Sequence, residues 1–171
     1  TRRARGWKEL DKWQIDLLQT KDQFSIVNCS RQSGKSSILM IKAFHTAIIN
    51  PGCLIIIVSK LDQADEDMRK CKDLYRAYND HLHHTYGGVL ALGLLEDNKG
   101  TIELGNRSRI KTIAATGHAR GFSAPRMVII DEARDVPDEA FVAVKPMLVV
   151  SNGQLLISST PGGTGGFFYT E

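Results

Sequence analysis

Short apolar runs alternate with longer segments of helical period along the chain. The runs that predict strands are residues 24–29, 54–58, 127–130 and 155–161. Two of them, 54–58 and 127–130, are apolar without alternation, which is typical of strands covered on both faces. The segments that predict amphipathic helices are residues 7–18, the stretch from Gly34 to Asn50, residues 62–79 and a stretch that begins at 135–139 and is ended or kinked by Pro146. Strands that alternate with helices predict an α/β fold, with a mostly parallel sheet flanked by helices.

A different pattern fills the middle of the chain. Thr101–Leu104 and Arg109–Ile113 flank a Gly-Asn turn and predict an antiparallel hairpin inserted beside the parallel strands. Its basic residues predict a solvated face, with contact to a DNA backbone as the alternative. The segment 89–95 is compatible with either helix or strand. The histidines at 81, 83 and 84 match no usual zinc spacing and predict a polar loop.

The loop after the first strand carries the strongest chemical signal. It reads Cys29-Ser30-Arg31-Gln32-Ser33-Gly34-Lys35-Ser36 and leads into a helix that opens near Ser37. Backbone N–H groups in such a loop, together with the positive end of the helix, bind nucleotide phosphates. Lys35 would reach the β- and γ-phosphates, and the Ser36 hydroxyl would ligate Mg²⁺. Cys29 stands where the common pattern has its first glycine, and a chance Gly-Lys-Ser is the alternative interpretation.

A second signal follows the strand over residues 127–130. Asp131 and Glu132 lie at its carboxyl end, and the carboxyl ends of parallel strands share one edge of a sheet. Asp131 is therefore expected beside Ser36, where it would hold Mg²⁺ directly or through water. Glu132 would orient the attacking water, which predicts hydrolysis in addition to nucleotide binding. The alternative is an acidic pair that only caps the next helix.

Other polar residues are candidates for the same site. Ser159 and Thr160 end the fourth strand and would sense the γ-phosphate, or would simply bond the loop backbone. Gln14, beside Trp13, offers both a donor and an acceptor and would read adenine, or would lie on the surface of a packing helix.

Four arginines are candidates for contact with the charge of a phosphoryl-transfer transition state. Arg31 lies inside the phosphate loop, and Arg120 lies in a glycine-flanked loop from which it would reach a neighbouring subunit. Arg126 and Arg134 are the alternatives.

Composition narrows the class of protein without naming a substrate. The 171 residues are 42% hydrophobic, enough for one domain with a sizeable core, and the formal net charge of +3 is compatible with nucleic acid. No apolar run approaches the roughly 20 residues of a membrane-spanning helix, and the cysteines form no CxxC pair. A basic N-terminal lead, residues 1–6, is expected to be mobile. The absence of an initiator Met predicts a fragment of a longer protein.

Together these motifs resemble the ATPase domain of the large terminase subunit of tailed bacteriophages, the motor that packages DNA into procapsids. The resemblance is carried by Ser30–Ser36, Met127–Glu132, Arg120-Gly121, Ser158–Gly162 and Trp13-Gln14. It spans about residues 7 to 166. That family tolerates a residue other than glycine at the start of the loop, which accommodates Cys29.

The resemblance implies a P-loop, RecA-like fold of the additional-catalytic-glutamate class, with ATP and Mg²⁺ as ligands. Glu132 would be the catalytic carboxylate, Arg31 a γ-phosphate contact and Arg120 an arginine finger acting in trans. Ser36 and Asp131 would hold the metal, and Ser159 and Thr160 would couple hydrolysis to movement. The residues that would bind the nucleotide are Gln14, Ser30, Arg31, Gln32, Ser33, Gly34, Lys35, Ser36 and Ser37.

The implied function is ATP hydrolysis that powers translocation of double-stranded DNA into a viral procapsid. The implied partners are DNA, a homo-oligomeric ring, the portal protein and the small terminase subunit, in the host cytoplasm and transiently at the procapsid portal, with no membrane. Residues 1–171 would be one ATPase domain, without a complete lid subdomain and without the C-terminal nuclease.

Two alternatives remain open. The first is a superfamily 2 helicase-like core, since Asp131-Glu132-Ala133 and Ser158-Ser159-Thr160 are similar to motifs of that class. The second is a nucleotide-dependent module for ring assembly or portal docking, with little turnover.

Overall fold

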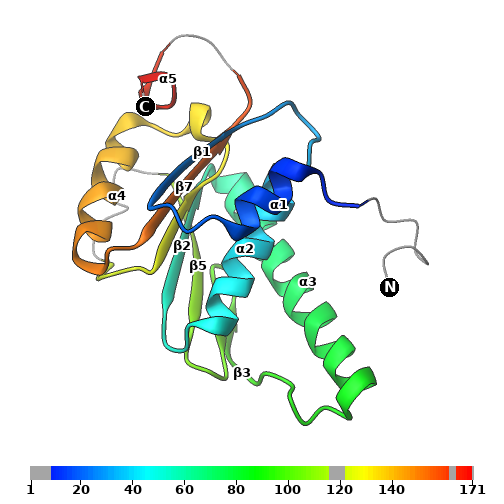
Figure 1. The fold of residues 1–171 in the computed structure, drawn as a ribbon. Helices are drawn as coiled ribbons and strands as arrows, with labels where there is room; N and C mark the ends of the chain where they lie inside the picture. Colours follow the sequence, from blue (N-terminus) through cyan, green and yellow to red (C-terminus); the bar gives the residue numbers. More distant parts are fainter. Residues whose placement is uncertain (1–8, 116–121, 162–164, 171) are drawn as a thin grey trace.

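A seven-stranded sheet lies between two layers of helices in the computed structural model, which describes residues 9–115, 122–161 and 165–170 (Figure 1). The strands are β1 (Phe24–Asn28), β2 (Leu54–Ser59), β3 (Leu94–Asn98), β4 (Thr101–Leu104), β5 (Arg109–Ala114), β6 (Met127–Ile130) and β7 (Gln154–Ser159). The helices are α1 (Lys12–Gln19), α2 (Lys35–Ile49), α3 (Leu61–Tyr86), the 3₁₀ turn η2 (Ala133–Asp135), α4 (Asp138–Ser151) and α5 (Phe167–Thr170).

The strand order is β1-β7-β6-β2-β5-β4-β3. The first five strands in this order run parallel, and only β4 and β3 are antiparallel to their neighbours. The predicted α/β fold, with a mostly parallel sheet and an antiparallel hairpin, is therefore confirmed.

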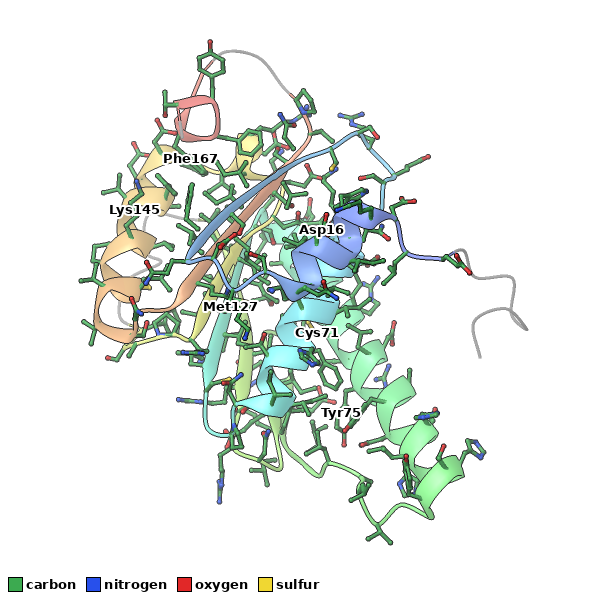
Figure 2. The ribbon with its side chains drawn as sticks, in the orientation of Figure 1. Asp16, Cys71, Tyr75, Met127, Lys145 and Phe167 are labelled. Carbon is green, nitrogen blue, oxygen red and sulfur yellow. The ribbon has the colours of Figure 1, made fainter. Side chains whose placement is uncertain are left out.

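Each central strand buries alternate side chains in different cores. Ile55 and Ile57 of β2 pack with α1, α2 and α3, whereas Ile56 and Val58 pack with α4, η2 and α5. All four side chains are fully buried, as the unbroken apolar run predicts for a strand covered on both faces. Figure 2 shows the two layers through their side chains, with Tyr75 on one side of the sheet and Lys145 and Phe167 on the other.

The middle of the chain differs in two ways from the prediction. The segment 89–95 is mostly turn and loop, and only its last two residues enter β3, which pairs with β4 and continues the antiparallel hairpin by one more strand. The prediction of a polar loop at the histidines was wrong, because α3 runs through His81, His83 and His84 to Tyr86. The helix ends only at Gly87, whose φ of +62° makes a left-handed cap that glycine adopts without strain.

One helix boundary departs from the prediction, and another decides between two alternatives. Asp11 and Gln14 form a reciprocal capping box, so α1 begins at Lys12. Pro146 lies inside α4, which continues to Ser151, so the proline does not end the helix. No helix within the described residues is long and apolar enough to cross a membrane.

β1 forms the outer strand of the sheet on one side. It pairs in parallel with β7 from Phe24 to Asn28, and no described strand pairs with its other edge. Phe24 and Ile26 remain 40% and 37% exposed. The β1–β7 pairing continues one residue further, because the backbone N–H of Cys29 donates to the carbonyl of Ser159 at 3.2 Å. The phosphate loop therefore starts directly beside the end of β7.

Candidate active site

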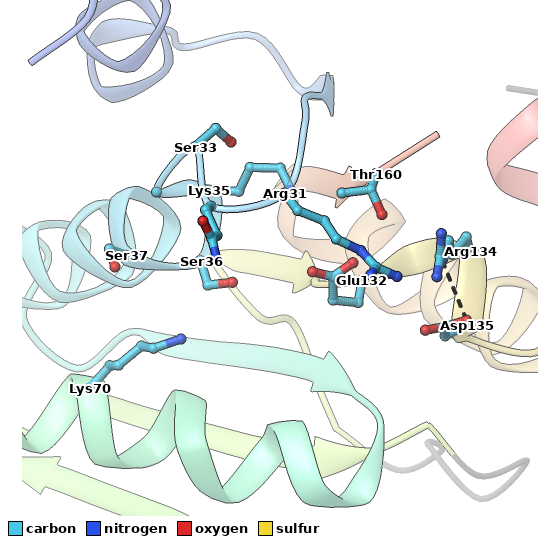
Figure 3. Close-up of a pocket in the computed structure, with 12 residues that line it drawn as sticks. Arg31, Ser33, Lys35, Ser36, Ser37, Lys70, Glu132, Arg134, Asp135 and Thr160 are labelled. Carbon is cyan, nitrogen blue, oxygen red and sulfur yellow. Dashed lines mark ion pairs between the residues drawn. The ribbon is translucent and has the colours of Figure 1, made fainter. Parts of the chain in front are cut away.

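A cleft of about 460 Å³ lies at the carboxyl edge of the parallel strands (Figure 3). The residues that line it are Arg31, Gln32, Ser33, Gly34, Lys35, Ser36, Ser37, Lys70, Glu132, Arg134, Asp135 and Thr160. The loop after β1, the turn after β6 and the end of β7 thus meet in one place. This convergence is what the sequence pattern predicts for a parallel sheet.

The backbone of the loop explains where glycine is needed and where it is not. Gly34 has φ +84°, and a Cβ placed there would lie 3.1 Å from Nε2 of Gln14. Gln32 also has a positive φ, of 60°. Cys29 is not among the residues with positive φ, so its position accepts a side chain. The missing first glycine is therefore compatible with the geometry of the loop.

Lys35 opens α2 and is only 5% exposed. Its Nζ donates to the carbonyl oxygens of Cys29, at 3.3 Å, and Ser30, at 3.0 Å. Among the described residues, no carboxylate lies within 4.0 Å of the charged groups of Lys35 or Arg31. Two cations without an acidic partner and the N-terminus of α2 therefore face the same cleft, an arrangement that suits an anion.

Asp131 lies fully buried beneath the cleft. Its Oδ1 accepts hydrogen bonds from Ser158 Oγ, at 2.5 Å, and from the backbone N–H of Glu132, at 3.0 Å. Its Oδ2 has no hydrogen-bond partner in the described part of the chain. A buried carboxylate oxygen without a donor, next to a cleft lined by the Ser36 hydroxyl, fits a hard cation such as Mg²⁺.

Glu132 turns the chain from β6 into η2. Its φ and ψ are both 49°, a left-handed conformation that is uncommon for a residue other than glycine, asparagine or aspartate. Such conformations cost about 1 kcal/mol or more, and they cluster at functional sites. The bond from its N–H to Asp131 holds the turn, and its side chain lines the cleft.

The end of β7 is bonded to this turn. Ser159 is fully buried, and its Oγ accepts a hydrogen bond from the backbone N–H of Arg134 at 3.2 Å. The Arg134 guanidinium lies 3.6 Å from Asp135 and donates to the carbonyl of Pro161 at 3.4 Å. Lys60 also contacts Asp135, at 2.9 Å, and this hydrogen bond keeps the pKa of the Asp135 carboxyl below its usual value.

Several predicted residues lie elsewhere. Gln14 lines a separate hollow beside α1 and donates to the carbonyl of Ser33 at 3.1 Å, so its contact with adenine stays a prediction. Ser30 offers its carbonyl to Lys35 and does not line the cleft. Arg126 immediately precedes β6, at the amino ends of the parallel strands and thus away from the cleft, where its N–H donates to the carbonyl of Leu54. Arg120 lies outside the described residues.

Three residues of the site were not predicted from the sequence. Ser158 bonds Asp131, and Lys70 reaches the cleft from α3. Asp67, one turn before Lys70, is fully buried, and its pKa is raised from 3.8 to about 6 by burial and by the nearby charge of Asp131. The parallel register pairs Ile130 with Ile157, so Asp131 and Ser158 are the next residues on neighbouring strands. That register is the signal from which Ser158 could have been found.

Solved structures share this fold. The ATPase domain of the Thermus phage P74-26 large terminase has a TM-score of 0.75 at 22% identity, over 99% of this chain and 71% of that one. The large terminase of a thermophilic bacteriophage, in complex with ADP, has a TM-score of 0.74 at 11% identity, over 94% of this chain and 41% of that one. The Phi-28 gp11 DNA packaging motor has a TM-score of 0.58 at 17% identity, over 85% of this chain and 48% of that one.

The sequence itself also matches a known family. The family model of the terminase large subunit, T4likevirus-type, N-terminal, matches residues 26–170, which include the phosphate loop, the Asp-Glu turn and the end of β7. The chain therefore belongs to the N-terminal domain family of T4likevirus-type large terminase subunits.

Proposed function

We propose that this domain binds and hydrolyses ATP and that, in the intact protein, hydrolysis powers translocation of double-stranded DNA into a viral procapsid. The observation that carries the proposal is the cleft itself. In it, Arg31 and Lys35, which have no acidic partner among the described residues, lie near a glutamate held in a left-handed turn and a buried aspartate. One oxygen of that aspartate has no hydrogen-bond partner in the part of the chain that the structure describes. The family match supports a nucleotide as the ligand, as do the complexes of the thermophilic bacteriophage large terminase with ADP and with ATP-gamma-S.

The residues have distinct roles in nucleotide binding. Lys35 would exchange the carbonyls of Cys29 and Ser30 for β- and γ-phosphate oxygens, because its ammonium already lies at the mouth of the loop. Ser36 and the unbonded oxygen of Asp131 would hold Mg²⁺, with Ser158 fixing the orientation of that carboxylate. The ion would neutralise charge on the β- and γ-phosphates when bound.

The chemical step would depend on orientation and charge. Glu132 would align the attacking water and accept its proton, a role worth about 10²–10⁴ in rate. Arg31 would stabilise the charge that develops on the γ-phosphate. Arg120 would stabilise the same charge from a neighbouring subunit of a ring, and an arginine in such a position raises the rate of hydrolysis about 10³- to 10⁵-fold. Ser159 and Thr160 would transmit the state of the γ-phosphate to β7.

The partners in the intact protein would be double-stranded DNA, further copies of the chain in a ring, the portal protein and the small terminase subunit. The protein would act in the host cytoplasm, transiently at the procapsid portal. The family match over residues 26–170 favours this packaging ATPase over a helicase core.

Phosphate release by this domain with MgATP tests the hydrolytic role. Lys35→Ala is expected to abolish nucleotide binding, whereas Glu132→Gln is expected to bind ATP and hydrolyse it at least ~100-fold more slowly. Glu139→Gln, on the exposed first turn of α4, is the matched control and should hydrolyse ATP normally. Turnover by Glu132→Gln at the parent rate would contradict the assignment and would favour a binding module.

A mixing experiment tests the role of Arg120. If this residue acts in trans, Arg120→Ala and Lys35→Ala proteins should each be inactive alone and should regain ATP hydrolysis when mixed at concentrations where rings form. An inactive mixture in which ring formation has been verified would refute action in trans. Strand-displacement assays on the full-length protein separate a translocase, which leaves the duplex intact, from a helicase.

A further inference from the structure

Lys70 is a cation of the cleft that comes from α3, outside both the phosphate loop and the Asp-Glu turn. It lies on α3, one turn after Asp67, and its side chain extends from that helix toward the space beside Ser36 (Figure 3). The Lys70 side chain is 28% exposed. Most of its aliphatic stem is thus covered, and the ammonium is held at the wall of the cleft.

The ammonium of Lys70 is only loosely paired. Its Nζ lies 3.7 Å from Oδ1 of Asp67, which is an ion pair but is too long for a direct hydrogen bond. Arg134, in contrast, both pairs with Asp135 and donates to the carbonyl of Pro161. Among the described residues, no acceptor lies within hydrogen-bond distance of Lys70. Three N–H donors at the cleft wall are therefore available to an anion.

Asp67 anchors this ammonium from inside the protein. Its Oδ2 accepts a hydrogen bond from Ser59 Oγ at 3.0 Å, and its Oδ1 accepts one from Gln63 Nε2 at 2.8 Å. Aspartate is almost never fully buried unless it is paired, and here burial beside Asp131 makes ionisation unfavourable. The two hydrogen bonds hold the carboxylate in place, and its charge lies next to the ammonium of Lys70.

The position of Lys70 indicates which part of a nucleotide it would meet. The hollow on the α1 side of the loop is lined by Gln14, by residues just before α1 and by residues of the phosphate loop and α2, and Lys70 does not line it. Lys70 instead shares the cleft with Ser36 and Glu132, and its anchor Asp67 lies near Asp131. It therefore stands at the end of the cleft where the terminal phosphate would lie.

We propose that Lys70 contacts the terminal phosphate of a bound nucleoside triphosphate and that Asp67 is its positioning residue. This inference rests on the proposed ATP-binding function. It makes α3, which is remote in sequence from the phosphate loop, a part of the site that distinguishes ATP from ADP.

Equilibrium binding of ATP-gamma-S and of ADP, each with Mg²⁺, tests the inference by calorimetry. Lys70→Met should weaken ATP-gamma-S binding about tenfold or more, the usual loss for a hydrogen bond to a charged group, and should change ADP binding less than threefold. Lys70→Arg should restore ATP-gamma-S binding to within threefold of the parent. Arg76→Met, an exposed residue further along α3, is the matched control and should alter neither affinity.

A parallel loss of affinity for both nucleotides, or for neither, would overturn the role of Lys70. If Lys70→Met does not fold, Asp67→Asn decides the question, because it keeps both hydrogen bonds of the side chain and releases Lys70. An unchanged ratio of the two affinities in Asp67→Asn would then overturn it. If the parent protein binds neither nucleotide, the ATP-binding function itself is refuted. If the parent binds both nucleotides and Lys70→Met binds them with the same affinities, only the role of Lys70 is refuted.

Discussion

Asp67→Asn should make the nucleotide-free protein more stable, and the gain should depend on pH. The pKa of Asp67 rises from 3.8 to about 6 on folding, so the folded protein binds this proton more tightly than the unfolded chain does. Stability therefore falls as the pH rises through the window from about 4 to about 6. Each unit of pKa difference between the folded and unfolded states corresponds to about 1.36 kcal/mol, so the full cost of the ionised carboxylate above that window is ~3 kcal/mol.

The structure also indicates what the substitution would lose. The amide oxygen of an asparagine can accept the Gln63 donor, and its NH₂ group can donate to the Ser59 hydroxyl, so both hydrogen bonds survive. The loose ion pair with the partly exposed Lys70 needs no separate correction, because its charge already lowers the pKa of Asp67 and is contained in the value of about 6. We therefore expect a net gain of about 3 kcal/mol at pH 8 and almost no gain at pH 4.

Urea denaturation followed by circular dichroism, at constant ionic strength from pH 4 to pH 8 without nucleotide or Mg²⁺, measures this difference. Asp73→Asn, on the exposed face of the same helix, is the control and should track the parent within about 0.5 kcal/mol at every pH. The reasoning is refuted if Asp67→Asn is less stable than the parent at pH 8, or if its advantage is the same at pH 4 and pH 8.

Three further substitutions test other parts of the site and its supports. Ser158→Ala should destabilise the fold by about 1.5–3 kcal/mol in urea denaturation, because buried Asp131 loses a charge-assisted hydrogen bond, and should weaken Mg²⁺-dependent nucleotide binding about 10- to 100-fold. Gly34→Ala should lower stability by about 1–2 kcal/mol and reduce ATP affinity. The alanine would have to adopt a left-handed φ, and its Cβ would lie 3.1 Å from Nε2 of Gln14. Lys42→Met should lower the free energy of unfolding by about 2–3 kcal/mol, measured by thermal unfolding. The reason is that the buried Nζ of Lys42 donates to the carbonyls of Leu18, in the last turn of α1, and Thr20, just after it.

Each of these substitutions has a matched control. Ser25→Ala, on the half-buried outer strand, should be nearly neutral. Gly52→Ala has a similar φ, of +75°, but nothing within 4 Å, so the difference between it and Gly34→Ala isolates the contact with Gln14. Lys99→Met removes an exposed ion pair with Asp65 and should cost less than about 1 kcal/mol. Equal effects in a variant and its control would contradict the corresponding explanation.

The parts of this fold that could be predicted from sequence are those encoded by local pattern. Unbroken apolar runs identified β2 and β6, the polar Gly-Lys-Ser segment after β1 identified the phosphate loop, and the carboxylates after β6 identified the acidic turn. β3 could not be predicted, because Leu94–Asn98 shows no alternation and is mostly exposed, so that its pairing with β4 defines it. Lys70 and Asp67 could not be predicted either. Their place at the cleft depends on how α3 is rotated against the sheet, which no spacing within the helix reveals.

The outer strand has a consequence for how this domain behaves in concentrated solution. β1 presents a row of backbone N–H and C=O groups that no described strand pairs, flanked by the half-exposed side chains of Phe24 and Ile26. An open edge of this kind is a template on which a second copy can add its own edge strand. Such self-association would join molecules through β1 and would not involve the cleft. A charged residue at position 26 should therefore suppress aggregation of the domain while leaving its nucleotide chemistry intact.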